Sequence, residues 1–97
     1  MDSAWDRILD LIDHLAADPS RPIGPDVERT FADHAAQAVS DRDIDTELHV
    51  PDIARWLTAL VAAHRAIRTS HPEVDADTEL ANLRRIATRW LHPPRPR

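Results

Sequence analysis

The sequence contains no cysteine and no lysine, and Gly24 is its one glycine in 97 residues. Without cysteine the chain cannot form a disulfide, a thiolate nucleophile or a cysteine-ligated metal site. One glycine is too few for a glycine-rich phosphate loop, a dinucleotide-binding fingerprint or a nucleophile elbow. The lack of lysine excludes Schiff-base chemistry. These absences exclude several kinds of enzyme chemistry.

Long apolar runs are also missing. The longest nearly apolar run, residues 59–63, is far shorter than the roughly 20 residues that cross a membrane. Four aspartates stand among the first fifteen residues, where a secretory signal or a transit peptide would carry none. We therefore expect a cytoplasmic protein that does not enter a membrane.

Acidic and basic residues are distributed unevenly along the chain, whose net charge is −5. Residues 1–79 hold all 17 acidic residues and 7 arginines, a charge of −10. Residues 80–97 hold 5 arginines and no acidic residue, a charge of +5. This asymmetry favours docking of the basic end on an acidic surface.

Four segments show the apolar periodicity of helices, and they cover about residues 4–17, 25–40, 51–69 and 78–92. Ser3 is placed to cap the first segment. Pro25 and Pro51 stand in the first turns of the second and third, where proline is tolerated. Pro19 and Pro72 end the first and third.

These segments predict an all-α, single-domain four-helix bundle over residues 1–92. Residues 93–97, rich in proline and arginine, predict a disordered basic tail or a linker to a further domain.

The third helix is apolar around most of its circumference, so we expect it to be the most buried of the four. One broad side consists of Ile53, Trp56, Leu57, Leu60, Val61 and Ile67. A second side carries small residues, namely Ala59, Ala62, Ala63 and Ala66. The alanine side can pack against the alanine-rich second helix, which we favour, or against a second copy of the chain.

His64 falls in the middle of the broad apolar side. Burial disfavours the charged imidazole, so we expect a neutral side chain that satisfies its N–H within the core. The alternative is that His64 lines a ligand pocket together with Trp56 and Trp90.

Acidic residues at alternate positions from Asp41 to Glu47 raise the question of a calcium loop. An EF-hand loop requires glycine where Thr46 stands, and a bidentate glutamate where the shorter Asp52 stands. The acidic run over residues 73–79 has no glycine either. We predict solvated loops that lead into helices, with no metal and no cofactor.

No nucleophile or acid–base pair shows catalytic spacing, because the serines fall at predicted helix ends. The basic end could contact phosphates, but the acidic remainder of the chain opposes nucleic acid. We interpret Arg85 and Arg89 as solvent-facing residues that stabilise a helix C-terminus.

The remaining hypothesis is a non-catalytic protein–protein interaction module, such as an adaptor, accessory subunit or regulator, whose partner is another protein or a second copy of itself. Its expected surfaces are the alanine side, Ala59, Ala62, Ala63 and Ala66, and the basic end, Arg84, Arg85, Arg89, Arg95 and Arg97. The alternatives are a ligand-binding or enzymatic bundle with a pocket at His64, Trp56 and Trp90, and, less favoured, a nucleic-acid-binding regulator.

Overall fold

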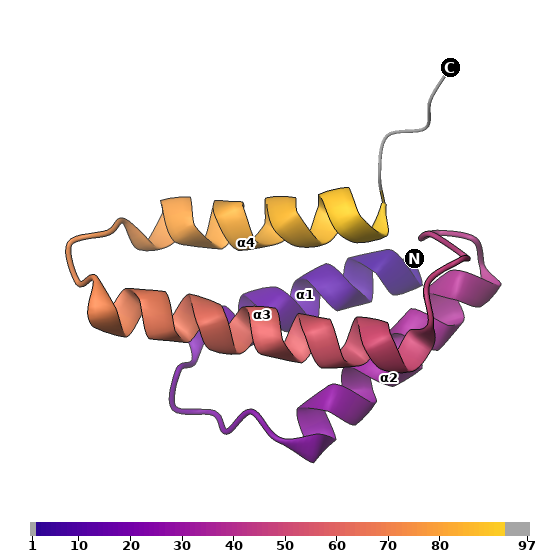
Figure 1. Cartoon of the computed structure of the whole chain (residues 1–97), viewed down its shortest axis with the longest axis horizontal. Helices are drawn as coiled ribbons and strands as arrows, with labels where there is room; N and C mark the ends of the chain where they lie inside the picture. Colours follow the sequence, from indigo (N-terminus) through magenta and orange to yellow (C-terminus); the bar gives the residue numbers. More distant parts are fainter. Residues whose placement is uncertain (1, 93–97) are drawn as a thin grey trace.

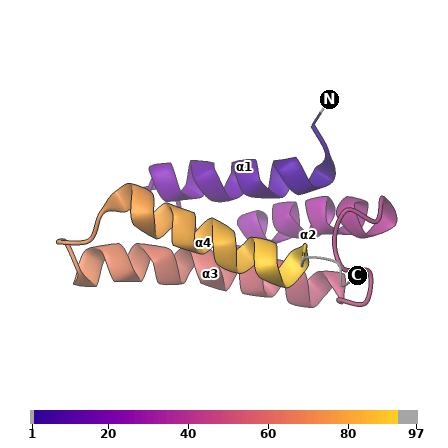
Figure 2. The ribbon, with the colours of Figure 1, turned by 90° about the horizontal axis from the view of Figure 1, so that it is seen from above.

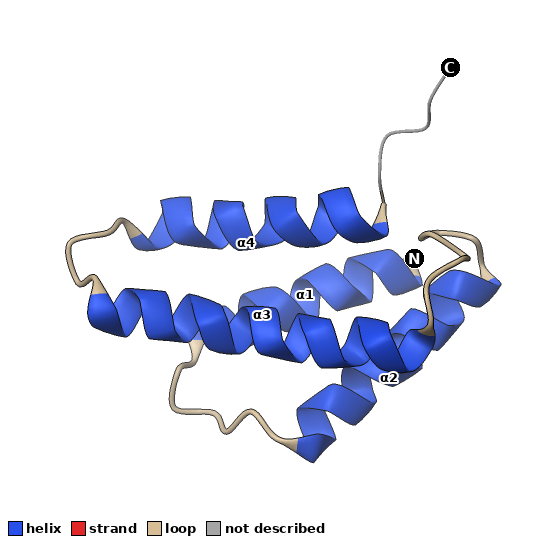
Figure 3. Ribbon diagram, in the orientation of Figure 1, coloured by secondary structure: helices blue, strands red, loops and turns tan. Residues whose placement is uncertain are grey.

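The computed structural model describes residues 2–92, which form four helices (Figures 1 and 3). The helices are α1 (Ala4–Ala17), α2 (Pro25–Ser40), α3 (Val50–Ser70) and α4 (Ala76–Leu91). Residues 2–92 contain no strand, so the predicted all-α four-helix architecture is confirmed. The predicted tail at 93–97 lies outside the described residues.

Local capping sets the helix starts. Ser3 and Asp6 form a capping box: the Ser3 hydroxyl accepts from the Asp6 N–H at 3.0 Å, and the Asp6 carboxylate accepts from the Ser3 N–H at 3.1 Å. At α4, the Asp75 carboxylate accepts from the N–H and the hydroxyl of Thr78. Because Asp75 is the cap, α4 begins at Ala76, two residues before the predicted start.

The helices enclose one core. Helices α3 and α4 run antiparallel, joined by a short turn, while α1 lies behind them and α2 below (Figures 1 and 2). Helix α3 contacts the other three, most extensively α2. The largest fully buried side chains are Ile8, Ile12, Leu15, Phe31, Ile53, Leu57, Val61 and Leu91. Each stabilises the fold by about 1.5–3 kcal/mol through loss of apolar contact with water.

The prediction that the third helix is the most buried is wrong. Helix α1 buries five of its 14 residues, whereas α3 buries five of its 21. The physical reason is that all three neighbours of α3 pack against the same side of it, so the residues of its opposite side stay exposed. The alanine that it buries is Ala54, beside α2, rather than any member of the predicted alanine side.

Arg65 joins α3 to the end of α1. Its guanidinium donates to the carbonyl oxygens of Leu15 at 2.9 Å, Asp18 at 2.9 Å and Arg21 at 2.6 Å. The last carbonyls of a helix have no partner within that helix, and an arginine side chain can supply several donors at once. Arg65 therefore holds the connection between α1 and α2 against α3.

The loop between α2 and α3 closes the opposite end of the bundle. It buries Ile44, and the Asp45 N–H donates to the carbonyl of Leu91, the last residue of α4, at 2.8 Å. His92 Nδ1 lies 2.6 Å from the carbonyl oxygen of Asp43, and its ring stacks on Trp5 with centroids 5.9 Å apart. These contacts satisfy the C-terminus of α4 and fix it against the start of α1.

We expect Arg65→Met to lower the free energy of unfolding by about 1.5–3 kcal/mol, because three carbonyl oxygens, one of them partly buried, lose a charged donor while the aliphatic stem is kept. Urea unfolding followed by circular dichroism measures the change. Arg68→Met is the control, since Arg68 is an exposed arginine of the same helix, and it should change stability by no more than about 0.5 kcal/mol. Equal losses in the two variants would contradict the role of Arg65.

Candidate functional site

His64 lies in the core with 5 % of its surface exposed. Loss of hydration lowers the pKa of His64, as do the nearby Arg68 and Arg65, while Glu79 partly opposes them. The expected burial in a neutral form is thus supported. The expected local hydrogen bond is wrong: neither ring nitrogen has a partner among the described residues.

The predicted pocket residues Trp56 and Trp90 differ in exposure from the buried His64. Trp56 is 58 % exposed and Trp90 is half-buried against the core. One hollow lies on α4, and a second, of about 330 Å³, lies between α2 and α3. Neither is lined by His64, Trp56 or Trp90. The placement of Trp56 on the covered side of the third helix was wrong, because α4 leaves that edge of α3 open.

Two carboxylates of the loop between α2 and α3 serve local structure. Asp41 accepts a hydrogen bond from the Gln37 side chain at 2.8 Å, and Asp45 accepts from the Glu47 N–H at 2.9 Å. Within residues 2–92, no three histidine or acidic residues are grouped in a way that could hold a metal ion.

The exposed large apolar side chains gather on two helices. They are Trp56 and Ile67 of α3, 58 % and 41 % exposed, and Ile86 of α4, 53 % exposed. Ile86 therefore does not belong to the buried side of its helix. All four residues of the predicted alanine side, Ala59, Ala62, Ala63 and Ala66, are exposed as well. The favoured prediction that this side packs against the second helix is therefore wrong.

Helix geometry places Ile67 and Ile86 on adjoining flanks. Arg65 reaches back to α1, so Ile67, two residues and about 200° further round, points away from α1. On α4, Arg84 donates to the carboxylate of Asp13 in α1, with 2.5 Å between Nη1 and Oδ2. Ile86 is also two residues, about 200°, further round its helix, so it points away from α1, to the flank of α4 beside α3. The two isoleucines consequently border the same open side of the α3–α4 pair, which faces the viewer in Figure 1.

We call this surface the α3–α4 apolar face and define it as Trp56, Ala59, Ala62, Ala63, Ala66, Ile67 and Ile86. Along α3 it extends over the twelve residues from Trp56 to Ile67, about 16 Å or three helical turns. Contiguous exposed apolar surfaces are typical of interaction sites.

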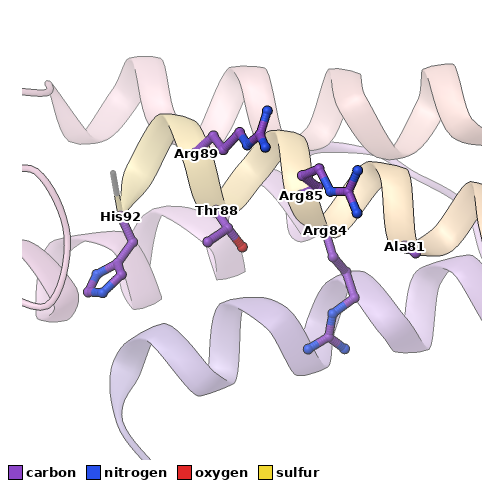
Figure 4. A pocket seen from close by; sticks show the side chains of 6 residues that line it. All are labelled: Ala81, Arg84, Arg85, Thr88, Arg89 and His92. Carbon is purple, nitrogen blue, oxygen red and sulfur yellow. The ribbon is translucent and has the colours of Figure 1, made fainter. Parts of the chain in front are cut away.

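The predicted basic residues of α4, Arg84, Arg85 and Arg89, line a second surface of this helix. Figure 4 shows them around a hollow of about 510 Å³ on the outer side of the helix, lined by Ala81, Arg84, Arg85, Thr88, Arg89 and His92. Arg84 turns toward α1 and pairs with Asp13, whereas no ion pair within residues 2–92 involves Arg85 or Arg89. The predicted Arg95 and Arg97 lie outside the described residues.

Comparisons of the chain with known protein families, curated proteins and solved structures find no match. No helix within residues 2–92 has the length and apolar character that crossing a membrane requires.

We expect acid to destabilise the protein below pH about 6.5 partly through His64. An unfolded histidine binds its proton with a pKa of about 6.5, whereas folded His64 binds it more weakly, so the unfolded state takes up more protons as the pH falls. The contribution of His64 is fully present above about 6.5 and is lost below it, by at most about 1.4 kcal/mol per pH unit.

Urea unfolding at pH 7.5, 6.5, 5.5 and 4.5, in steps chosen to bracket the histidine pKa, compares the wild type with His64→Leu. The variant should lose less stability than the wild type over this range, and the exposed His14→Leu should follow the wild type. Asp18 and Asp75 also have lowered carboxyl pKa values, but their effect on stability changes only below pH about 3.8, which is under the pH range of this experiment. Parallel curves for wild type and His64→Leu would show that His64 is not kept neutral by burial.

Proposed function

We propose that this protein is a non-catalytic protein–protein interaction module that binds through the α3–α4 apolar face. The observation that carries the proposal is the exposure of Trp56, Ile67 and Ile86 on one side of two neighbouring helices. Transfer of this area from water to a protein interface is favourable in proportion to the area covered. An adaptor, an accessory subunit or a regulator would use such a surface.

The shape of the face supports a helical occupant. Its centre consists of alanines, whose small side chains allow a second helix to approach to the short end of the usual 8–10 Å between axes. Trp56 and Ile67 stand toward the two ends of the alanine row and supply the larger contacts. Tryptophan in particular is enriched among the residues that dominate binding energy.

Site-specific photocrosslinking in the cells that make the protein tests the proposal. A photoreactive phenylalanine analogue replaces Ala63 at the centre of the face, or Ala36 on α2 as the control. Both positions are exposed alanines within helices, so the cost to folding should be similar. We expect a discrete covalent adduct from position 63, identified by mass spectrometry, and none from position 36.

The adduct can join two copies of this chain or this chain and another protein, and both results support the proposed function. Adducts that are equally abundant from the two positions, or absent from both, would contradict it.

A further inference from the structure

We infer that the occupant of the α3–α4 apolar face is a second copy of the same chain, arranged so that the two α3 helices run antiparallel about a two-fold axis. This inference rests on the proposed function, because it names the partner of the same surface. Three independent features of the described residues support it: the exposed apolar area, the spacing of the alanines and the charge pattern of the α3–α4 pair.

The alanine spacing is unchanged when the helix is read backwards. The segment Ala59–Ala66 has the pattern A-x-x-A-A-x-x-A. A two-fold axis brings residue i of one copy to residue j of the other and j to i. With the axis between Ala62 and Ala63, Ala59 of each copy meets Ala66 of the other, so alanine meets alanine at every step. A helix of unrelated sequence would have to supply this match separately.

The same arrangement also affects the larger apolar residues, Ile67 and Ile86. The two-fold axis passes between the two α3 helices, is perpendicular to both, and lies in the plane that separates the two copies. Both α4 helices therefore lie on the same side of the α3 pair. Ile86, on the flank of α4 beside α3, then lies on the same side of the α3 pair as Ile67 of the other copy. The exposed isoleucines of the two helices thus leave water together.

The charges along α4 also favour an antiparallel pair, because one end of the helix is acidic and the other is basic. The turn before α4 and its first turn carry Glu73 and Glu79, whereas its C-terminal half carries Arg85 and Arg89. Antiparallel pairing sets the acidic end of one copy against the basic end of the other, twice per dimer. Parallel pairing would set like charges together, which costs free energy.

Sedimentation equilibrium between about 1 and 300 μM tests the inference, since a contact of this modest size corresponds to weak affinity. We expect the wild type to pass from monomer to dimer within this range. Ala63→Glu places a charge at the centre of the contact and should weaken dimerisation at least tenfold, while Ala36→Glu, on α2, should behave as the wild type. Thermal unfolding of dilute samples checks that both variants fold.

Disulfide crosslinking tests the direction and register, because the chain has no cysteine of its own. Ala63→Cys should form covalent dimers on oxidation, and Ala36→Cys should not. Ala59→Cys and Ala66→Cys should crosslink more efficiently when mixed than when each is oxidised alone. More efficient crosslinking of each variant with itself would overturn the antiparallel arrangement.

Charge reversal gives a readout that misfolding cannot imitate. Arg85→Glu/Arg89→Glu removes the positive charge from the C-terminal half of α4, and Glu73→Arg/Glu79→Arg removes the negative charge from the opposite end of the α3–α4 pair, so each variant alone should dimerise more weakly than the wild type. A mixture of the two should recover association as a heterodimer.

A wild-type monomer at the highest concentration, or a mixture that associates no better than its components, would overturn the inference. A monomer that nevertheless forms a specific adduct with another protein from position 63 would leave the proposed function standing and refute the second copy as its partner.

Discussion

The bond between Arg65 and the end of α1 sets the arrangement of the other elements. Helices α1 and α3 are distant in the sequence, and the guanidinium ties them together through three carbonyl oxygens of the α1–α2 connection. With this flank of α3 turned inward, its opposite flank must turn outward. Trp56 and Ile67 lie on the side of α3 opposite to Arg65, so they are exposed because Arg65 faces α1.

The helices could be predicted from the sequence because their ends depend on local chemistry. Ser3 caps α1, Pro25 begins α2, and both the burial of His64 and the lowering of its pKa agree with its apolar neighbours in the sequence. The error of two residues at α4 has the same local origin, because Asp75 and Asp77 are equally good capping residues by type.

What could not be predicted is which side of α3 is covered. A helical projection shows that the helix has two apolar sides, but it does not tell which of them meets a neighbour. Arg65 resembles Arg55 and Arg68 in its local sequence, yet Arg65 alone of the three reaches the carbonyls of α1. Such a contact depends on the tertiary arrangement, which no short-range pattern encodes.

The stacking of Trp5 on His92 links the first helix of the chain to the residue that follows the last. Helix ends ordinarily fray one by one, because the terminal turns have few contacts. Here, separation of the first turn of α1 and unwinding of the last turn of α4 disturb one shared pair of rings. The two extremities of the described chain should therefore open together, as a single cooperative unit.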